Sequence, residues 1–392
     1  MNILDYVLIA FMVIYAFSGY QQGFLVGAAS TLGLLVGGFV GIRVAPLVLA
    51  HLSPGFAVTV GALAIVLGLA FLGQALGAYL GHLMRRRVTW RPARVVDALT
   101  GAVLSVAAML LIAWVLGVAV SGAQLPGLNA EVRSSALLAG VNQILPGQSS
   151  RVASAFSSIV DSSGFPRYLE PFVPEQILPV RRPNAAILHR AGVVRDARSV
   201  VRVLGIAPSC DRSLEGSGFV FAAGRVLTNA HVVAGTTRVQ VVLRGHDFPA
   251  EVVLYNPRVD VAVLDVPGLS APALHLAGPV ARGRQVAVLG YPENGPYDAE
   301  PGRIRSEQRL QSPDIYGDGT VYRDTYSLYA LVREGNSGGP VVTGTGRVAG
   351  VVFAASVVDS DTGYALTSSQ VRRAVDRGRA ADREVSTGAC TG

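Results

Sequence analysis

The sequence predicts an N-terminal all-α bundle of about four transmembrane helices, followed by a C-terminal all-β part with a sandwich or barrel architecture. The first third of the chain contains long apolar runs, each near or above the ~20 residues that a helix needs to cross a bilayer core. The second half contains many short strand-like runs separated by turn residues, which is typical of a sandwich or barrel. We therefore expect a transmembrane domain at 1–120, an extracytoplasmic connector at 121–195 and a β domain at 196–392.

The composition narrows the function classes. Apolar residues make up 51% of the chain and the net charge is +7. The mean hydropathy of +0.43 is high for a soluble protein, and the apolar excess lies at the N-terminus. The arginines form no basic stripe with interleaved aromatic residues, so nucleic acid is not an expected partner.

Four apolar stretches form the predicted membrane domain, at residues 3–20, 24–50, 56–83 and 98–120. The first lacks the basic start and the cleavage site of a signal peptide, so we expect it to stay as a helix. A three-helix alternative, with one segment re-entrant, remains open. Glycines recur four residues apart in two of the stretches, which would let those helices pack closely. They are Gly33, Gly37, Gly41, Gly73, Gly77 and Gly81.

Five arginines between the third and fourth stretches predict the orientation: Arg85, Arg86, Arg87, Arg91 and Arg94. Basic loops stay in the cytoplasm. The chain after residue 120 is therefore expected outside the cytoplasm, on the periplasmic side of the inner (plasma) membrane. No acidic residue occurs between Asp5 and Asp97, so a proton relay through this domain is not expected.

The connector is rich in serine, proline and glycine, and two stretches in it favour short helices, at 130–145 and 151–160. Its proline-rich run at 179–183 should be extended and semi-rigid. Arg181 and Arg182 form a dibasic pair inside this run. The pair is either a cleavage site, including one for autocleavage, or simply solvated charge.

Short apolar runs with turns between them make up the predicted β domain. The expected strands lie at 199–206, 218–222, 226–228, 239–243, 252–255, 261–266, 284–289, 302–308, 326–332, 340–342 and 348–354. A closing helix is expected at 367–379, with Ser368 or Ser369 near its N-cap.

The stretch G-N-S-G-G-P, from Gly335 to Pro340, has the features of a nucleophile loop. Its glycines permit a tight turn that leaves the hydroxyl of Ser337 uncovered. The N–H groups of Gly335 and Ser337 can then point at one spot where an oxyanion would develop. A serine needs a base and a group that orients the base. His231 in T-N-A-H-V-V is the candidate base and Asp260 in D-V-A-V-L is the candidate orienting group.

Each of these residues also has an ordinary structural interpretation, such as a glycine-rich hairpin, a core histidine or a turn-capping aspartate. Asp265 is the nearest rival to Asp260, but strand alternation places its side chain on the opposite face. The three motifs together, in the order His, Asp, Ser, favour catalysis over those separate interpretations.

The three motifs, in this order and at this spacing, resemble those of trypsin-like serine proteases of the bacterial HtrA type. G-S-G-F from Gly216 resembles a strand of the same family, so the resemblance covers roughly residues 200–380. It implies a chymotrypsin-like double β-barrel and a serine endopeptidase that cuts protein or peptide substrates without a metal or cofactor. The triad would be His231, Asp260 and Ser337.

Two further resemblances concern the membrane domain and the chain as a whole. D-Y-V-L-I from Asp5 and G-Y-Q-Q-G-F from Gly19 resemble the colicin V production type of membrane domain. The combination of membrane anchor, connector and barrels resembles the actinobacterial membrane-anchored serine proteases that are linked to acid resistance. That resemblance implies a stress response role in the cell envelope.

The substrate pocket is predicted from positions around the nucleophile. Leu331 lies six residues before Ser337, where a trypsin-like specificity would require an acidic residue. A pocket floored by Leu331 and walled by Phe353, Ala354 and Ala355 should prefer an apolar side chain. Asn336 stands where digestive proteases carry an aspartate, so their zymogen switch is not expected in the same form.

Cys210 and Cys390 bracket the β domain. They are either two free thiols or a disulfide, and a disulfide would persist in an oxidising, extracytoplasmic compartment. Two other functions stay open besides a serine endopeptidase. One is a peptide-binding membrane scaffold or transport-assisting protein with a non-catalytic protease fold, and the other is an enzyme that cuts only itself.

Overall fold

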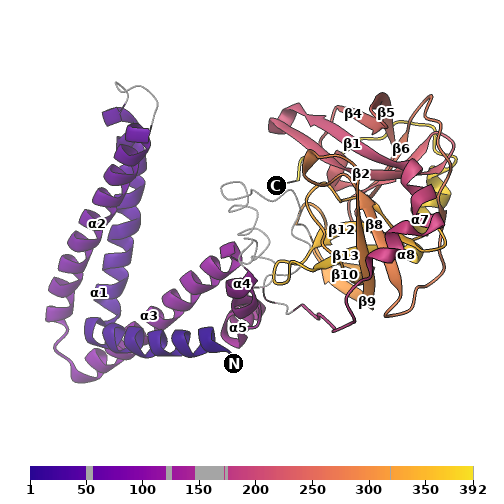
Figure 1. Cartoon of the computed structure of the whole chain (residues 1–392). Helices are drawn as coiled ribbons and strands as arrows, with labels where there is room; N and C mark the ends of the chain where they lie inside the picture. Colours follow the sequence, from indigo (N-terminus) through magenta and orange to yellow (C-terminus); the bar gives the residue numbers. More distant parts are fainter. Residues whose placement is uncertain (50–55, 121–125, 146–171, 173–174, 318, 392) are drawn as a thin grey trace. The chain divides into compact units, whose positions relative to one another are not determined.

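A computed structural model describes residues 1–49, 56–120, 126–145, 172, 175–317 and 319–391 (Figure 1). It forms two compact units. The first contains residues 1–114 and 136–141, and the second contains residues 115–135 and 142–392. The expected helix at 151–160 lies outside the described residues, whereas the one expected at 130–145 is two short helices, α4 (Pro126–Arg133) and α5 (Ala136–Ile144).

Three helices in the described part of the chain are long and apolar enough to cross a membrane. They are α1 (Ile3–Leu49), α2 (Phe56–Arg87) and α3 (Arg91–Val120). The first two expected stretches, 3–20 and 24–50, lie on either side of a non-helical residue, Gly23, within α1. Its apolar segment Ile3–Gly41 has 39 residues. A straight helix of that length would measure about 58 Å, roughly twice a ~30 Å bilayer core.

A break at Gly23 divides this long segment into two shorter helical parts. Gly23 has φ 76° and ψ 166°, which is not a helical conformation. The broken ends are both capped: the Asp97 carboxylate accepts the N–H of Leu25 at 2.9 Å, and the Arg85 guanidinium donates to the carbonyl of Gln22 at 2.6 Å. Arg85 and Asp97 also form an ion pair at 3.0 Å. Because these two residues flank the turn between α2 and α3, Gly23 lies at the level of that turn.

Glycines on facing sides of α1 and α2 let these helices approach closely. A Cβ placed on Gly33 would lie 2.1 Å from the carbonyl oxygen of Gly73, and one on Gly77 would lie 2.1 Å from the carbonyl oxygen of Ala29. The expected close packing of these glycines is therefore confirmed, and larger residues would force the two backbones apart.

The second unit contains two β-barrels that are preceded by η1 (Ala185–His189), α7 (Ala191–Asp196) and η2 (Ala197–Ser199). The first barrel is closed by six antiparallel strands in the order β1-β2-β3-β6-β5-β4. Their bounds are β1 Val200–Ala207, β2 Arg212–Ala222, β3 Arg225–Thr228, β4 Arg238–Leu243, β5 His246–Asn256 and β6 Val261–Asp265.

The second barrel is a seven-stranded sheet in the order β11-β8-β9-β10-β13-β12-β7, closed by an additional β11–β12 pairing. Its strands are β7 His275–Leu276, β8 Gln285–Gly290, β9 Asp298–Ser312, β10 Val321–Tyr329, β11 Pro340–Thr343, β12 Arg347–Ala355 and β13 Thr362–Thr367. Two of these strands, β7 and β13, have no counterpart among the expected strand ranges, and β7 pairs in parallel with the first residues of β12, Arg347 and Val348. The all-β double barrel expected from the sequence is confirmed.

One hydrophobic cluster holds the two barrels together. Phe219, Phe221 and Val263 of the first barrel share it with Leu289 and Phe353 of the second. Helix α8 (Ser368–Gly378) follows β13, and its N-cap is Thr367 instead of the expected Ser368 or Ser369. The Thr367 hydroxyl accepts the N–H of Gln370 at 3.2 Å. The two barrels therefore pack against each other through a shared core.

Candidate active site

His231 and Asp260 form a buried pair at one end of the first barrel. His231 begins the turn η4 (His231–Val233) after β3, and Asp260 directly precedes β6. The His231 Nδ1 lies 2.8 Å from the Asp260 Oδ2, and the other carboxylate oxygen accepts the backbone N–H of His231 at 2.9 Å. Their side chains are 5% and 0% exposed. The carboxylate thus fixes the ring through Nδ1 and turns Nε2 away from itself.

The backbone of Asp260 is held in an unusual conformation. Its φ of 66° lies in the left-handed region, which non-glycine residues rarely adopt. Two hydrogen bonds maintain it. Asn229 donates its side-chain amide to the Asp260 carbonyl at 2.8 Å, and the Asp260 N–H donates to the Asn256 carbonyl at 2.9 Å. Such strain persists where the surroundings determine it, and this is common at functional sites.

Ser337 lies between β10 and β11 of the second barrel, but its loop is bonded to the first barrel. The Ser337 carbonyl accepts the N–H of Ser217 on β2 at 2.7 Å. Gly338 packs so closely that an added Cβ would lie 2.1 Å from the Ser217 carbonyl and 2.4 Å from the hydroxyl of Thr228. Thr228 ends β3, three residues before His231. The loop of Ser337 is therefore held against the part of the first barrel that carries His231.

The peptide before Gly335 is oriented by a hydrogen bond to a neighbouring loop. The carbonyl of Glu334 accepts the N–H of Glu293 at 2.8 Å. Because a trans peptide directs its C=O and N–H to opposite sides, the N–H of Gly335 points away from Glu293. Gly335 has φ 86°, a conformation that glycine adopts without strain.

Ser217 fixes the peptide after Gly335. Its buried hydroxyl donates to the Gly335 carbonyl at 2.7 Å and accepts the N–H of Tyr291 at 2.9 Å. Ser217 and Asn229 both lie in motifs that resemble the family, but the sequence did not predict what their side chains do. Their partners lie far away in the chain, so no local pattern could have found them.

Asn336 and Arg333 anchor the same loop to β9. The Asn336 side-chain carbonyl accepts the N–H of Arg333 at 2.8 Å. The Arg333 guanidinium in turn contacts the carboxylates of Asp298, Glu300 and Glu293. Asn336 thus takes an internal structural role at the position where digestive proteases carry an aspartate.

The four expected pocket residues divide into two groups. Leu331 is 39% exposed and Ala355 is half-buried, so both reach the surface. Phe353 and Ala354 are buried in the cluster shared by the two barrels. The side chain of Phe353 therefore supports the end of β12 from within.

Asp265, the rival of Asp260, makes an ion pair with Arg225 instead. Two other histidines of the barrels, His246 and His275, are exposed. Cys210 and Cys390 are joined in a disulfide.

Comparisons with known proteins match both parts of the chain. A family model for the trypsin-like peptidase domain matches residues 216–351, and a model for the colicin V production protein matches residues 4–146. The chain is 39% identical over 390 residues to the serine protease Rv3671c of Mycobacterium tuberculosis H37Rv, covering 99% of this chain and 98% of the relative.

Other relatives and solved structures match a smaller part of the chain. The mitochondrial serine protease HTRA2 of Bos taurus is 34% identical over 186 residues, which cover 45% of this chain and 40% of that protein. Among solved structures, the active form of the Rv3671c protease from M. tuberculosis aligns with a TM-score of 0.55 and 45% identity, covering 57% of this chain and 99% of that chain. The two sequence resemblances, to trypsin-like proteases and to the colicin V production type, are thus confirmed.

Proposed function

We propose, for a chain that belongs to the family of membrane-anchored, trypsin-like serine proteases, that His231, Asp260 and Ser337 are its catalytic triad. The observation that carries the assignment is the buried 2.8 Å contact between His231 Nδ1 and Asp260 Oδ2. It orients the ring as a general base requires, and the loop of Ser337 is bonded to the adjacent strands.

In the proposed mechanism, His231 takes the proton of Ser337 while the hydroxyl attacks a peptide carbonyl. Asp260 stabilises the imidazolium that forms. The N–H groups of Gly335 and Ser337 stabilise the tetrahedral oxyanion. His231 then gives this proton to the departing amine as the intermediate collapses, which leaves an acyl-enzyme that water hydrolyses. The reaction needs no metal or cofactor.

The proposed substrates are proteins or peptides with an apolar side chain at the cut site. Leu331 supports this preference because it is exposed and uncharged where a basic side chain would need an acid. The wall would be the half-buried side chain of Ala355 and the backbone of Phe353 and Ala354. Nucleic acid is not among the proposed partners.

The protease is proposed to lie on the extracytoplasmic side of the plasma membrane, after a transmembrane domain at 1–120 and a connector at 121–195. Arg85, Arg86 and Arg87 end α2, and Arg91 begins α3, so the turn between the two helices is strongly basic. A cytoplasmic turn here sends the C-terminal end of α3 outward, whatever the number of spans before it. Substrates would then be envelope proteins, and a role in acid stress is proposed from the whole-chain resemblance.

The test uses the full-length protein in detergent, treated with a fluorophosphonate probe and analysed by intact mass. We expect one adduct on the parent protein and none on Ser337→Ala. Ser327→Ala, which changes a buried serine on β10, should label like the parent. Asp260→Asn should label more slowly, by up to the order of 10⁴-fold, because the ring would hold the wrong tautomer.

Two outcomes would favour the alternatives. An unlabelled parent would indicate a non-catalytic protease fold that only binds peptides. A labelled parent that cuts its own connector, but no added peptide at any concentration, would indicate an enzyme limited to autocleavage.

A further inference from the structure

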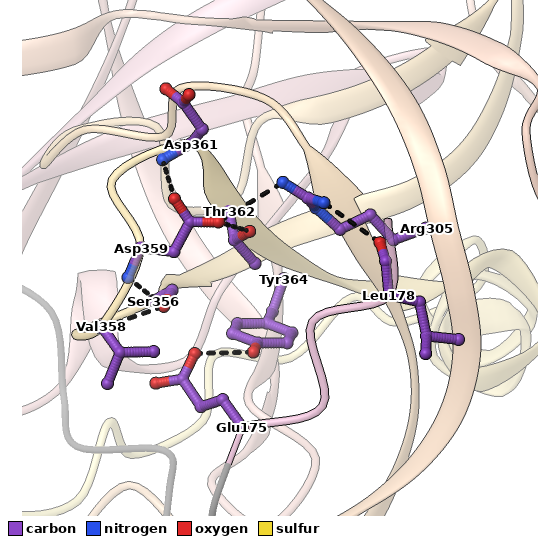
Figure 2. Close-up of polar contacts among 9 residues, drawn as sticks. All are labelled: Glu175, Leu178, Arg305, Ser356, Val358, Asp359, Asp361, Thr362 and Tyr364. Atoms are coloured by element: carbon purple, nitrogen blue, oxygen red, sulfur yellow. Dashed lines mark hydrogen bonds and ion pairs between the residues drawn. The ribbon is translucent and has the colours of Figure 1, made fainter. Parts of the chain in front are cut away.

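Residues 175–178 of the connector, which we call the strap, are bonded to the second barrel (Figure 2). One carboxylate oxygen of Glu175 accepts the N–H of Val357 at 3.3 Å, and the other accepts the hydroxyl of Tyr364 at 2.8 Å. Tyr364 lies on β13 and is buried. Burial, and then the charge of Glu175, raise the pKa of Tyr364, so its hydroxyl remains a hydrogen-bond donor. Glu175 therefore has two defined partners on the barrel.

Arg305 of β9 makes the second connection. Its guanidinium donates to the Leu178 carbonyl at 3.1 Å, lies 3.4 Å from the Asp359 carboxylate and stacks 4.3 Å from the ring centre of Tyr329. The Arg305 side chain is only 6% exposed. Burying a guanidinium is costly unless its N–H groups are paired. Arg305 thus joins the strap to the residues that follow β12.

Those residues form a tight loop at 356–361. The Ser356 hydroxyl accepts the N–H of Val358 at 3.1 Å and the N–H of Asp359 at 3.0 Å. The Asp359 carboxylate accepts the N–H of Asp361 at 3.1 Å and the hydroxyl of Thr362 at 2.8 Å (Figure 2). Because Asp359 is the centre of these contacts, its pairing with Arg305 sets the position of the whole loop.

The loop touches both sides of the proposed pocket. It begins directly after Ala355, at the end of β12. The carbonyl of Asp361 accepts the N–H of Ala330 at 3.0 Å, and Ala330 directly precedes Leu331. A shift of the loop would therefore move the wall at Ala355 and the floor at Leu331 together.

We propose that Glu175 and Arg305 are positioning residues for the substrate pocket, through which the docked strap sets the enzyme's selectivity for peptide side chains. Neither residue touches the reacting atoms. The connector that leads from the membrane is in this way a structural part of the specificity site. This inference rests on the proposed function, because the pocket matters only if Ser337 is the nucleophile.

The experiment compares full-length variants in detergent by two readouts. The first is the rate of Ser337 labelling by a small fluorophosphonate, which needs the triad but little of the pocket. The second is the cleavage of a peptide library that varies the side chain before the cut bond. For Glu175→Ala and for Arg305→Ala, we expect kcat/KM on the preferred peptide to fall about tenfold, mainly through KM. The apolar preference should flatten, while the labelling rate changes less than about twofold.

Arg282→Ala is the matched control. Arg282 donates to the Pro179 carbonyl at 2.9 Å, one residue after the contact of Arg305, and this bond does not involve Asp359. It should keep the parent's selectivity. Tyr364→Phe removes a single hydroxyl and keeps the packed ring, so it tests Glu175 without unfolding the barrel. Its effect should not add to that of Glu175→Ala.

The outcomes separate the two proposals. Unchanged peptide selectivity in Glu175→Ala and Arg305→Ala, with a labelled parent, overturns the role of the strap alone. An equal loss in Arg282→Ala also overturns it, since any loosened connector would then have the same effect. A parent protein that the probe does not label overturns the proposed function and, with it, this inference.

Discussion

At the residue scale, we predict that the hydroxyl of Ser217 positions the oxyanion site. This hydroxyl holds the Gly335 carbonyl at 2.7 Å and the Tyr291 N–H at 2.9 Å, and it is buried. Ser217→Ala would leave both groups without this partner and release the peptide next to the oxyanion site. We expect kcat to fall about 10- to 100-fold with KM nearly unchanged, somewhat less than the loss of a direct oxyanion donor.

Steady-state kinetics on one peptide substrate would measure this effect. Ser327→Ala is the control for removing a buried serine hydroxyl elsewhere. If Ser217→Ala keeps the parent's kcat, the hydroxyl does not position the oxyanion site. If KM rises and kcat stays constant, Ser217 acts on substrate binding instead.

We predict that Glu215 on β2 makes the stability of the folded protein depend on pH. Burial, and then the nearby charge of Glu334, raise the pKa of Glu215 above its usual value. The folded state then binds this proton more tightly than the unfolded state, so the charged form costs stability at neutral pH. That cost disappears as the pH falls through the raised folded pKa towards the ordinary value of about 4.3.

The variant Glu215→Gln should therefore unfold at a higher temperature than the parent at pH 7, and the difference should close below about pH 4. Thermal unfolding at several pH values measures it. Glu251→Gln, at an exposed position on β5, is the control. A constant difference between Glu215→Gln and the parent at every pH would contradict the argument.

The sequence identified the proposed triad because each of its residues sits in a short, ordered motif. His231 and Asp260 were then found in direct contact, 29 residues apart in the chain. Ser217 and Gly335 are 118 residues apart. Contacts over such separations arise from the packing of two barrels, and composition and local spacing carry no signal for them.

At the element scale, we predict that the glycines between α1 and α2 stabilise the membrane domain by allowing the two helices to pack closely. A Cβ on Gly73 would lie 2.2 Å from the Gly33 carbonyl oxygen, whereas one on Gly68 of the same helix meets nothing within 4 Å. Gly73→Ala should therefore lower the unfolding temperature of the full-length protein in detergent, while Gly68→Ala should keep or raise it. Equal effects of the two substitutions would show that these helices do not pack through Gly73.

The helices and strands also show which elements the hydrophobic pattern of the sequence predicts and which it does not. The apolar runs predicted helices on either side of Gly23, but they could not predict how the break at Gly23 is capped, because the capping groups belong to Arg85 and Asp97, far away in the chain. Strand β9 extends from Asp298 to Ser312, well beyond the expected 302–308, since pairing with β8 and β10 holds polar residues extended. The two-residue strand β7 has too few residues for any pattern.

At the scale of the whole molecule, the last residues of the second barrel return to the first. After α8, the Val385 N–H donates to the Val252 carbonyl at 2.8 Å, and the Gly235 N–H donates to the Thr387 carbonyl at 3.1 Å. The disulfide between Cys210 and Cys390 closes this path across a separation of 180 residues. A link over so long a loop stabilises the folded chain by up to about 5 kcal/mol in the chain-entropy model. When the disulfide is reduced, its two thiols can be used to measure the membrane orientation.

The prediction is that the disulfide faces the extracytoplasmic side while the turn between α2 and α3 faces the cytoplasm. After mild reduction of intact cells, a membrane-impermeant maleimide should label the parent protein at Cys210 and Cys390. In an Arg86→Cys variant that lacks both native cysteines, the same reagent should label only after the membrane is permeabilised. Labelling of Arg86→Cys in intact cells would reverse the orientation, because the basic turn would then lie outside. The barrels would in that case lie in the reducing cytoplasm, where a disulfide does not persist.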